Sequence, residues 1–579
     1  MKTVARKWAR LPEVYQVRAS GDGVWGFWTG KGDHGADVFC APVAGGHPEQ
    51  LTFGVDHHEI RDVSGDGMQL ILGQSRNGSE HDHLLLLDRR LGNKLRLLTP
   101  KQESHFLYGG AFFDGGVVFL ADHDYATGHG VSGAILWWQD LETGARRELG
   151  RLPRLGAGPE VSPDGKRLLL NVSTRAAGSG QVWLWDGALR EVLCLGEREN
   201  TRGTWIDDDQ IAVVSDHQGR DRVGVLSLEG GLEWLGGEPD FCPHEVIAGH
   251  GRWAVVSHDH GQVRAHEWRG AWEPIANPSS RRSFLPWAAL PDGWLGEAYD
   301  ADAPHEVWAA QPEKPRRLDV FKGPGTPTPR DFRWKAPDGA EVQGWLYLPE
   351  APRGLVVKVH GGPTWHSEDW CHPWIGFLTE MGWAVLDPNY RGSTGFGRDW
   401  REAIKLQGWG AEEQADIRAG IEAALALGIP PKVAVAGVSY GGFSSFYAIT
   451  RMADLVGAAI PVCGMWELAL DYQATGQDHL RDYSIEMMGG TPEEVPERYL
   501  NGSPASFVDQ VKGQVLVVQG LCDTNVSPEN AHAALRDLRA AGHKPEELFF
   551  KDEGHGITRP ANLETFFLRA QAFLEKSLC

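Results

Sequence analysis

The sequence predicts a two-domain protein: an N-terminal β-propeller of seven blades and a C-terminal α/β domain built on a doubly wound, mostly parallel sheet. Three observations lead to this prediction. Turn-forming tetrapeptides recur at nearly constant spacing in the first half, a Pro- and Gly-rich stretch follows them, and apolar strands then alternate with helical segments. The length of 579 residues also exceeds what one hydrophobic core usually supports, so two domains are expected.

The repeated turns predict the number of blades. Successive turns start 44, 49, 49, 45, 42 and 41 residues apart, and they are Ser20–Gly23, Ser64–Gly67, Phe113–Gly116, Ser162–Gly165, Asp207–Gln210, Gly249–Arg252 and Leu290–Gly293. Short apolar strands, several of them rich in Trp, follow most of these turns. A period of about 40–50 residues with several short strands per repeat is typical of propeller blades. We therefore assign residues 1–318 to a seven-bladed β-propeller.

The predicted domain boundary lies where proline and glycine cluster. Gly323–Pro329 reads Gly-Pro-Gly-Thr-Pro-Thr-Pro, a composition typical of linkers. We assign residues 319–329 to the linker and residues 330–579 to the second domain.

A nucleophile elbow is the clearest chemical motif. The apolar run that begins at Val433 leads into Gly437-x-Ser439-x-Gly441, and the residues from Phe443 onward have a helical pattern. A strand, a sharp turn and a helix are the context that a nucleophilic serine requires, and only glycine fits on both sides of so tight a turn. We predict that Ser439 is the nucleophile.

An acid and a base follow in the expected order. Asp523 comes after the apolar strand Gln514–Gln519, and His555 comes after the strand Glu547–Lys551. The order Ser, Asp, His is that of α/β-hydrolases, and the carboxyl ends of parallel strands meet at one crevice. A serine hydroxyl needs a nearby base, and that base needs a third group to hold its tautomer. We therefore predict an α/β-hydrolase catalytic domain with the triad Ser439, Asp523 and His555.

Two backbone N–H groups are predicted to form the oxyanion hole. The strand that begins at Gly354 ends in His360–Gly–Gly–Pro363, which is similar to the glycine-rich oxyanion loop of α/β-hydrolases. Gly362 on this loop and Tyr440, the residue after the nucleophile, are the predicted donors. Such donors stabilise the tetrahedral intermediate.

Five motifs occur in the order His360–Pro363, Asn389–Gly397, Trp409–Asp416, Gly437–Gly442 and Gly554–Gly556. Together they resemble the prolyl oligopeptidase family of serine peptidases, particularly its acylaminoacyl-peptidase branch. The resemblance covers about the last 250 residues in detail. It implies a propeller that caps the hydrolase domain and admits only short peptides to the serine. It also implies that Met1–Leu11 pack on the hydrolase domain.

Three residues are candidates for binding the substrate. Arg481 matches an arginine that binds a substrate carbonyl near P2 in the acylaminoacyl branch, and it could also anchor a terminal carboxylate. Trp466, which follows a strand, and Phe443 are candidates for lining the P1 pocket, although core positions fit them at least as well.

Several functions stay open on this scaffold. Dipeptidyl-peptidase relatives hold the substrate amino terminus with adjacent glutamates of the propeller, whereas the first Glu–Glu pair here is Glu412–Glu413, beyond the linker. This counts against a dipeptidyl peptidase, although separated acids could substitute. A carboxypeptidase, a carboxylesterase and a non-catalytic propeller protein that binds partners also stay open. The resemblance favours an acylaminoacyl-peptidase or oligopeptidase.

Composition excludes further classes of protein. The net charge of −22 argues against nucleic-acid binding, which requires a basic surface. No apolar run is long enough for a membrane span, and seven scattered cysteines form no disulfide or metal-binding pattern. We expect a cytoplasmic enzyme without cofactor or metal, and a homo-oligomer is compatible with the sequence. The runs His81–His83, Asp122–Asp124 and His258–His260 are expected to make turn hydrogen bonds rather than to bind metal.

Overall fold

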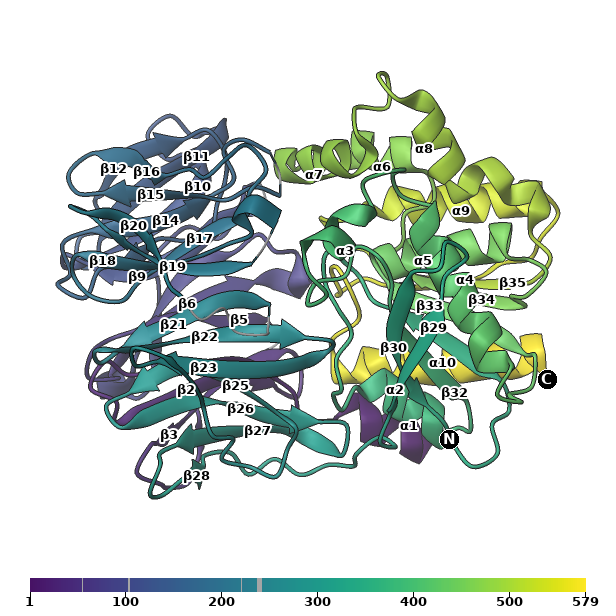
Figure 1. Cartoon of the computed structure of the whole chain (residues 1–579), viewed down its shortest axis with the longest axis horizontal. Helices are drawn as coiled ribbons and strands as arrows, with labels where there is room; N and C mark the ends of the chain where they lie inside the picture. Colours follow the sequence, from purple (N-terminus) through teal and green to yellow (C-terminus); the bar gives the residue numbers. More distant parts are fainter. Residues whose placement is uncertain (55, 103–104, 177, 220, 237–241) are drawn as a thin grey trace.

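The computed structural model describes residues 1–54, 56–102, 105–176, 178–219, 221–236 and 242–579. Two domains lie side by side, with the propeller on the left and the α/β domain on the right of Figure 1. Every helix among the described residues is too short or too polar to span a bilayer.

Among its described residues the propeller contains seven antiparallel sheets of four strands each, which confirms the predicted number of blades. In chain order the strands are β1 (Val14–Ala19), β2 (Trp25–Lys31), β3 (Ala36–Pro42) and β4 (Glu49–Gln50); β5 (His57–Val63), β6 (Gln69–Ser75), β7 (His83–Asp88) and β8 (Lys94–Leu97); β9 (Leu107–Phe113), β10 (Gly116–Asp124), β11 (His129–Asp140) and β12 (Arg146–Leu152); β13 (Glu160–Val161), β14 (Leu168–Val172), β15 (Gln181–Trp185) and β16 (Leu189–Leu193); β17 (Thr201–Trp205), β18 (Gln210–Ser215), β19 (Arg222–Ser227) and β20 (Gly231–Trp234); β21 (Pro243–Gly249), β22 (Arg252–Asp259), β23 (Gln262–Trp268) and β24 (Trp272–Pro274); and β25 (Ser283–Leu290), β26 (Gly293–Asp300), β27 (Ala303–Ala310) and β28 (Arg316–Arg317).

The repeated Ser-x-Asp-Gly turns join the first two strands of a blade. In the first blade the Asp22 carboxylate accepts hydrogen bonds from the Ser20 hydroxyl at 2.6 Å and from the Val24 N–H at 3.0 Å. Gly23 has a φ of 71°, which a residue with a side chain rarely adopts. Ser64 and Ser162 bond Asp66 and Asp164 in the same way. The sequence period therefore reflects a recurring turn geometry.

Neighbouring blades are held together by shared hydrophobic clusters. The last blade meets the first through a cluster that contains Val14, Val17 and Trp28 together with Leu290 and Leu295. Each blade consists of four consecutive strands, so the ring closes through side-chain packing and not through an exchanged strand.

The α/β domain is built on an eight-stranded sheet of order β29-β30-β32-β31-β33-β34-β35-β36, in which β29, β30 and β32 pair antiparallel and the remaining pairs are parallel. The strands are β29 (Arg330–Lys335), β30 (Glu341–Tyr347), β31 (Leu355–Val359), β32 (Ala384–Asn389), β33 (Val433–Val438), β34 (Ala458–Val462), β35 (Gln514–Gly520) and β36 (Glu546–Phe550). This topology confirms the predicted doubly wound, mostly parallel sheet.

Helices cover both faces of this sheet. One core cluster joins the sheet to α4 (Glu412–Leu425), α5 (Tyr440–Arg451) and α9 (Pro528–Ala540), and the other joins it to α1 (Lys2–Ala9), α2 (Pro373–Glu380) and α10 (Pro560–Leu578). The remaining helices are α3 (Arg398–Ala403), α6 (Leu468–Ala474), α7 (Asp478–Met488), α8 (Pro496–Gly502) and the 3₁₀ segment η4 (Pro504–Gln510).

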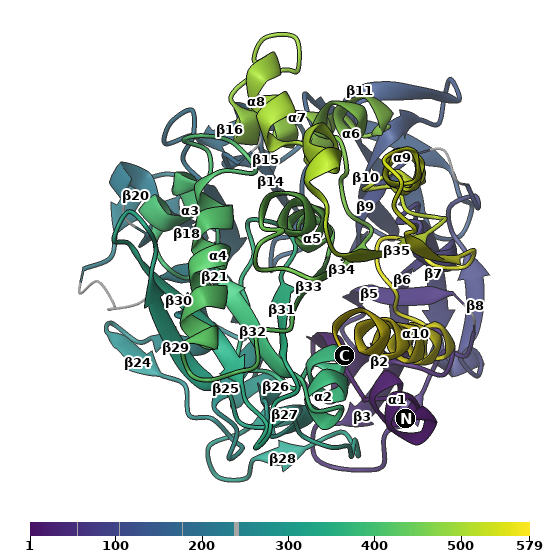
Figure 2. The ribbon, with the colours of Figure 1, turned by 90° about the vertical axis from the view of Figure 1, so that its right-hand side faces the viewer.

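The first helix lies on the α/β domain although the propeller follows it in sequence. Figure 2 shows α1 beside α2 and α10. Trp8 is buried, and its indole N–H donates to Glu380 at 2.7 Å, while Arg6 pairs with Glu564 at 3.1 Å. The chain thus passes between the domains both after α1 and between β28 and β29. The limits of the linker at 319–329 stay a prediction.

Candidate active site

Ser439 occupies a strained turn between β33 and α5. Its φ of 61° and ψ of −121° lie in a region that residues with side chains rarely adopt. A Cβ atom at Gly441 would stand 2.1 Å from the carbonyl oxygen of Val359, and one at Gly437 would stand 2.4 Å from the same atom. Both glycines are therefore required for the turn to pack against β31. Ser439 itself is half-buried.

Asp523 and His555 form a direct pair at the same edge of the sheet. His555 Nδ1 lies 2.9 Å and 3.0 Å from the two carboxylate oxygens of Asp523. The buried Asp523 also accepts the N–H groups of Asn525 at 2.9 Å and Val526 at 3.0 Å, and the Gln519 amide at 3.1 Å. These bonds fix the carboxylate, so the histidine ring is held in one orientation.

The surroundings raise the basicity of His555. Burial alone would lower the pKa of its imidazole, but the hydrogen bond and the negative charge of Asp523, with smaller contributions from Glu80 and Asp471, raise that pKa above its usual value of 6.5. The pair is therefore suited to accept and hold a proton.

The structure brings the serine to the same edge as this pair. The Ser439 N–H donates to the carbonyl of Val462, the last residue of β34, at 3.0 Å. Cys463 follows Val462, and its sulfur lies within 4.8 Å of an Asp523 carboxylate oxygen and of a His555 ring nitrogen. In the described part of the chain no hydrogen bond joins the Ser439 hydroxyl to His555. Catalytic hydrogen bonds are often long without substrate and shorten in the reactive complex.

The predicted oxyanion loop lies against the nucleophile. A Cβ at Gly361 would stand 3.4 Å from Ser439 Cβ and 4.0 Å from its Oγ, so the loop backbone passes directly beside the serine. The next residue, Gly362, has a φ of 113°. His360 braces the loop, because its ring nitrogens lie 2.7 Å from the Gly361 carbonyl oxygen and 2.9 Å from Ser393 Oγ.

The second predicted donor, Tyr440, is the first residue of α5. The first N–H groups of a helix have no partner within the helix. The phenol of Tyr440 donates to the buried Glu413 at 2.8 Å, which anchors this end of the helix. The oxyanion roles of Tyr440 and Gly362 stay predictions.

The three side chains predicted to bind substrate all make contacts within the α/β domain. Trp466 and Phe443 are completely buried in the core of the α/β domain. Trp466 packs on Phe446 and donates its indole N–H to Asp537 at 3.0 Å, so neither aromatic ring presents a face to a P1 side chain. The Arg481 guanidinium donates to Asp478 at 2.9 Å and to the Thr475 carbonyl. Pairing with the neighbouring Asp478 is the alternative to substrate binding, so the role of Arg481 near P2 stays a prediction.

A propeller loop that sequence reasoning missed reaches the triad. It comprises residues 76–82, between β6 and β7, and begins with η1 (Arg76–Gly78). The Thr524 hydroxyl donates to the Ser79 carbonyl at 3.0 Å, and the Asn525 amide donates to Glu80 Oε1 at 2.9 Å. Gly554 packs so closely on this loop that a Cβ there would overlap the Gly78 carbonyl oxygen.

Glu80 is the acidic group that this loop brings to the site. Its φ of 60° is unusual for a residue with a side chain. Burial raises the pKa of its carboxyl, and the nearby His555 opposes that rise. The Asn–Gly pair at 77–78 signals a turn, but nothing in the sequence indicates that this turn meets the triad.

A cavity of about 340 Å³ adjoins the elbow. Both domains line it, with Tyr15 from the propeller and Gly361, Trp365, Val438 and Phe566 from the α/β domain among its walls. Because these walls are mainly apolar, the cavity offers room for an apolar group next to Val438, the residue before Ser439.

The fold and this arrangement define a propeller-capped α/β-hydrolase with a serine, a histidine and an aspartate at one sheet edge. Comparison with known proteins agrees with this class. A family model described as the prolyl oligopeptidase family matches residues 373–579. These residues make up most of the α/β domain, and this domain belongs to the prolyl oligopeptidase family.

Similar proteins carry more than one name. Dipeptidyl peptidase family member 6 of Caenorhabditis elegans is 31% identical over 251 residues, which cover 42% of this chain and 34% of that protein. The acylamino-acid-releasing enzyme of Arabidopsis thaliana is 27% identical over 237 residues, covering 38% and 30%. The alignments thus span about a third of the length of these curated relatives.

A solved structure is similar over the whole chain. The puromycin-hydrolyzing peptidase of Mycobacterium tuberculosis superimposes with a TM-score of 0.83 at 22% identity, covering 100% of this chain and 96% of that one. This likeness supports the two-domain fold.

Proposed function

We propose that the chain is a serine peptidase that hydrolyses short peptides through an acyl-enzyme intermediate. The observation that carries this proposal is the Asp523–His555 pair at the sheet edge where Ser439 is held in a strained elbow. Ser439 attacks the scissile carbonyl while His555 takes its proton, and Asp523 stabilises the imidazolium. Backbone N–H groups of Tyr440 and Gly362 receive the oxyanion. His555 then protonates the leaving amine, and water releases the acyl group.

The position of the propeller supports a size filter. Loop 76–82 contacts both loops that carry the acid and the base, and Arg559 donates to Asn77 at 3.1 Å and to the His34 carbonyl at 3.0 Å. A folded protein could not reach Ser439 while these contacts persist, whereas a short peptide could enter the space between the domains. An apolar group of that peptide would occupy the cavity beside Val438.

An aminopeptidase mode is favoured by Glu80. A carboxylate from the propeller, held next to the triad, suits the ammonium group of a free peptide amino terminus. Curated relatives named dipeptidyl peptidases agree with this mode, and Glu80 is a separated acid of the kind that could replace a Glu–Glu pair. Acylaminoacyl-peptidase, carboxypeptidase and carboxylesterase activities are the alternatives on the same machinery.

The test is digestion of a peptide library with free and blocked termini, followed by mass spectrometry. The proposal predicts cleavage of short peptides and none of a folded protein; equal rates on both would exclude the size filter.

If Glu80 binds the amino terminus, Glu80→Gln raises KM about tenfold for free peptides and leaves N-acetylated peptides unaffected. The matched control Glu229→Gln, on the exposed side of the propeller, should change neither. Equal effects of Glu80→Gln on both substrate sets would exclude the aminopeptidase mode.

We also propose a cytoplasmic location. All seven cysteines are free thiols, which suits a reducing compartment. Fractionation of cells that produce the chain, with a periplasmic or secreted marker as control, tests this proposal; recovery with that marker would contradict it.

A further inference from the structure

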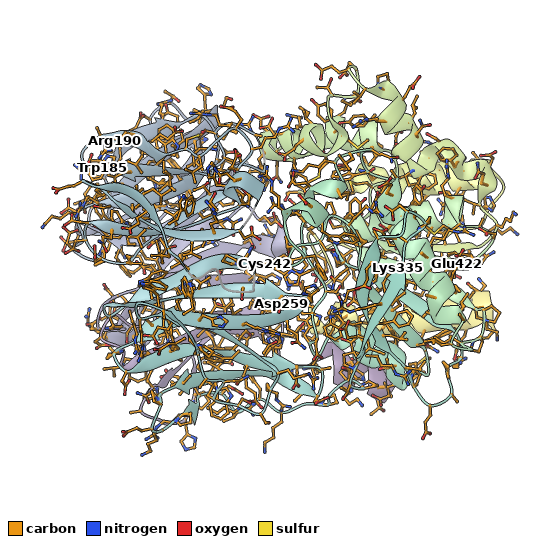
Figure 3. All side chains as sticks on the ribbon, viewed as in Figure 1. Trp185, Arg190, Cys242, Asp259, Lys335 and Glu422 are labelled. Atoms are coloured by element: carbon orange, nitrogen blue, oxygen red, sulfur yellow. The ribbon has the colours of Figure 1, made fainter. Side chains whose placement is uncertain are left out.

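Three potential metal ligands from both domains converge at the interface. His258 lies near the end of β22 in the sixth blade, and His366 and Glu368 lie on the segment between β31 and α2. His366 Nε2 and His258 Nδ1 are 2.9 Å and 3.6 Å from the same oxygen, Glu368 Oε1, and all three ligand atoms lie within 4.8 Å of one another. Figure 3 labels Asp259, the residue after His258, at the side of the propeller that faces the α/β domain.

Neighbouring groups orient two of these ligands. Thr394 Oγ1 lies 2.7 Å from His366 Nδ1, which leaves Nε2 as the nitrogen directed at the cluster. The Tyr299 hydroxyl donates to the other carboxylate oxygen of Glu368. Metal-binding histidines and carboxylates usually have such outer partners, which fix the ring tautomer and the direction of the lone pair.

His258 has an unexplained polar atom. Its Nδ1 is buried and makes no hydrogen bond among the described residues, although its ring packs edge-on against His366 with centroids 4.3 Å apart. A buried ring nitrogen without a partner is costly. A cation between His258 and Glu368 would remove that cost. The neighbouring His260 instead bonds Asp259 at 2.6 Å, as a turn residue would.

We propose that His258, His366 and Glu368 bind a divalent transition-metal ion of the zinc class, which replaces the turn role expected for His258 from the sequence. Two histidines and one carboxylate are a common zinc ligand set, with bonds of about 2.0–2.2 Å. In a tetrahedron of that size neighbouring ligand atoms are about 3.3 Å apart, close to the 2.9 Å and 3.6 Å observed. An adjoining cavity of about 50 Å³, lined in part by His258 and Thr394, has room for a water as the fourth ligand.

Such an ion would join the propeller to the loop beside the nucleophile. His366 follows Gly362, the predicted oxyanion residue, by four positions on the same segment. Metal binding would therefore hold this loop and the sixth blade together. The site is separate from the triad, so its role is to position the loop and the domains.

The test uses the full chain, stripped of metal with a chelator and dialysed. Titration with ZnCl₂ by calorimetry should give one bound ion per chain, and substitution with Co²⁺ should give the visible absorption of a tetrahedral site. His258→Ala and Glu368→Gln should abolish both signals. Thr394→Val, which removes an outer partner only, should weaken binding about 10–100-fold. His260→Ala and Cys463→Ser are the controls and should retain the full stoichiometry.

Thermal unfolding gives a second measurement. Zinc should raise the unfolding midpoint of the unmodified chain and of His260→Ala, and it should not raise that of His258→Ala. Absence of zinc binding to the unmodified chain would overturn the proposal. The proposal would also be overturned if the ion stayed bound in His258→Ala, because the ion would then lie elsewhere. Loss of the ion in Cys463→Ser would likewise overturn it, because the ion would then lie beside Asp523 and His555.

Discussion

Replacing Asp523 by asparagine tests how the acid supports the base. The change keeps the volume of the side chain but removes the charge that faces His555 Nδ1 at 2.9 Å and 3.0 Å. An amide can also donate to this nitrogen, which favours the tautomer that cannot accept the serine proton. The equivalent change in another serine-peptidase triad lowers kcat about 10⁴-fold. Four factors of ten correspond to about 5.4 kcal/mol of barrier.

The pH dependence of kcat/KM in Asp523→Asn gives a second, independent test, because the direction of its shift can be predicted. Catalysis requires neutral His555, so activity is present above the pKa of this residue and is lost as the pH falls through it. In the unmodified chain burial lowers this pKa, but Asp523, together with Glu80 and Asp471, outweighs burial and raises the pKa above 6.5. Without the carboxylate of Asp523 the lowering effect of burial is opposed less, so the pKa of His555 should fall. The acidic limb of kcat/KM should therefore move to lower pH.

The assay is steady-state hydrolysis of a short peptide substrate between about pH 5 and pH 9. Asp552→Asn is the matched control, because Asp552 is an exposed aspartate on the loop that carries His555, and it should change kcat less than about twofold. A loss below tenfold in Asp523→Asn, or an acidic limb that stays in place or moves to higher pH, would refute the role assigned to Asp523.

Three further substitutions test the framework around the site. Arg391→Ala leaves Asp416 buried without the guanidinium that contacts it at 2.7 Å, which should cost about 3–5 kcal/mol of stability; a midpoint of chemical denaturation unchanged from the parent would contradict this. Trp8→Ala removes a buried indole from the core shared with α2 and α10 and should cost about 3–5 kcal/mol, measured in the same way, whereas removal of the exposed Arg6 should cost far less. Gly361→Ala places a methyl group 4.0 Å from Ser439 Oγ and 3.2 Å from the Val438 carbonyl, so kcat should fall at least tenfold while the unfolding midpoint changes little; full activity would show that the loop is not held against the serine.

Local sequence patterns predicted the parts of this molecule that depend on local geometry. The seven blades follow from turns that recur every 41–49 residues, three of which are Ser-x-Asp-Gly turns closed by a hydrogen bond from the serine to the aspartate two residues later. The elbow at Ser439 follows from glycines that only a tight turn requires, and the positions of Asp523 and His555 follow from the rule that parallel strands end at one edge.

Contacts between distant segments were beyond such patterns. Glu80 reaches Asn525 across 445 positions of sequence, and His258 meets Glu368 across the domain interface. Trp466 and Phe443 illustrate a different limit. An aromatic side chain near the end of a strand can point either into a pocket or into the core. The contacts of Trp466 with Asp537 and Phe446 place its ring in the core, and the sequence does not reveal them.

Labelling with a fluorophosphonate, followed by mass spectrometry of the digested chain, tests the central claim most directly. If His555 and Asp523 activate Ser439, the reagent should modify Ser439 alone. Labelling should be lost in Ser439→Ala, and the reagent should react far more slowly with His555→Ala. Absence of labelling in the folded, unmodified chain, or a label on another residue that persists in Ser439→Ala, would contradict the account.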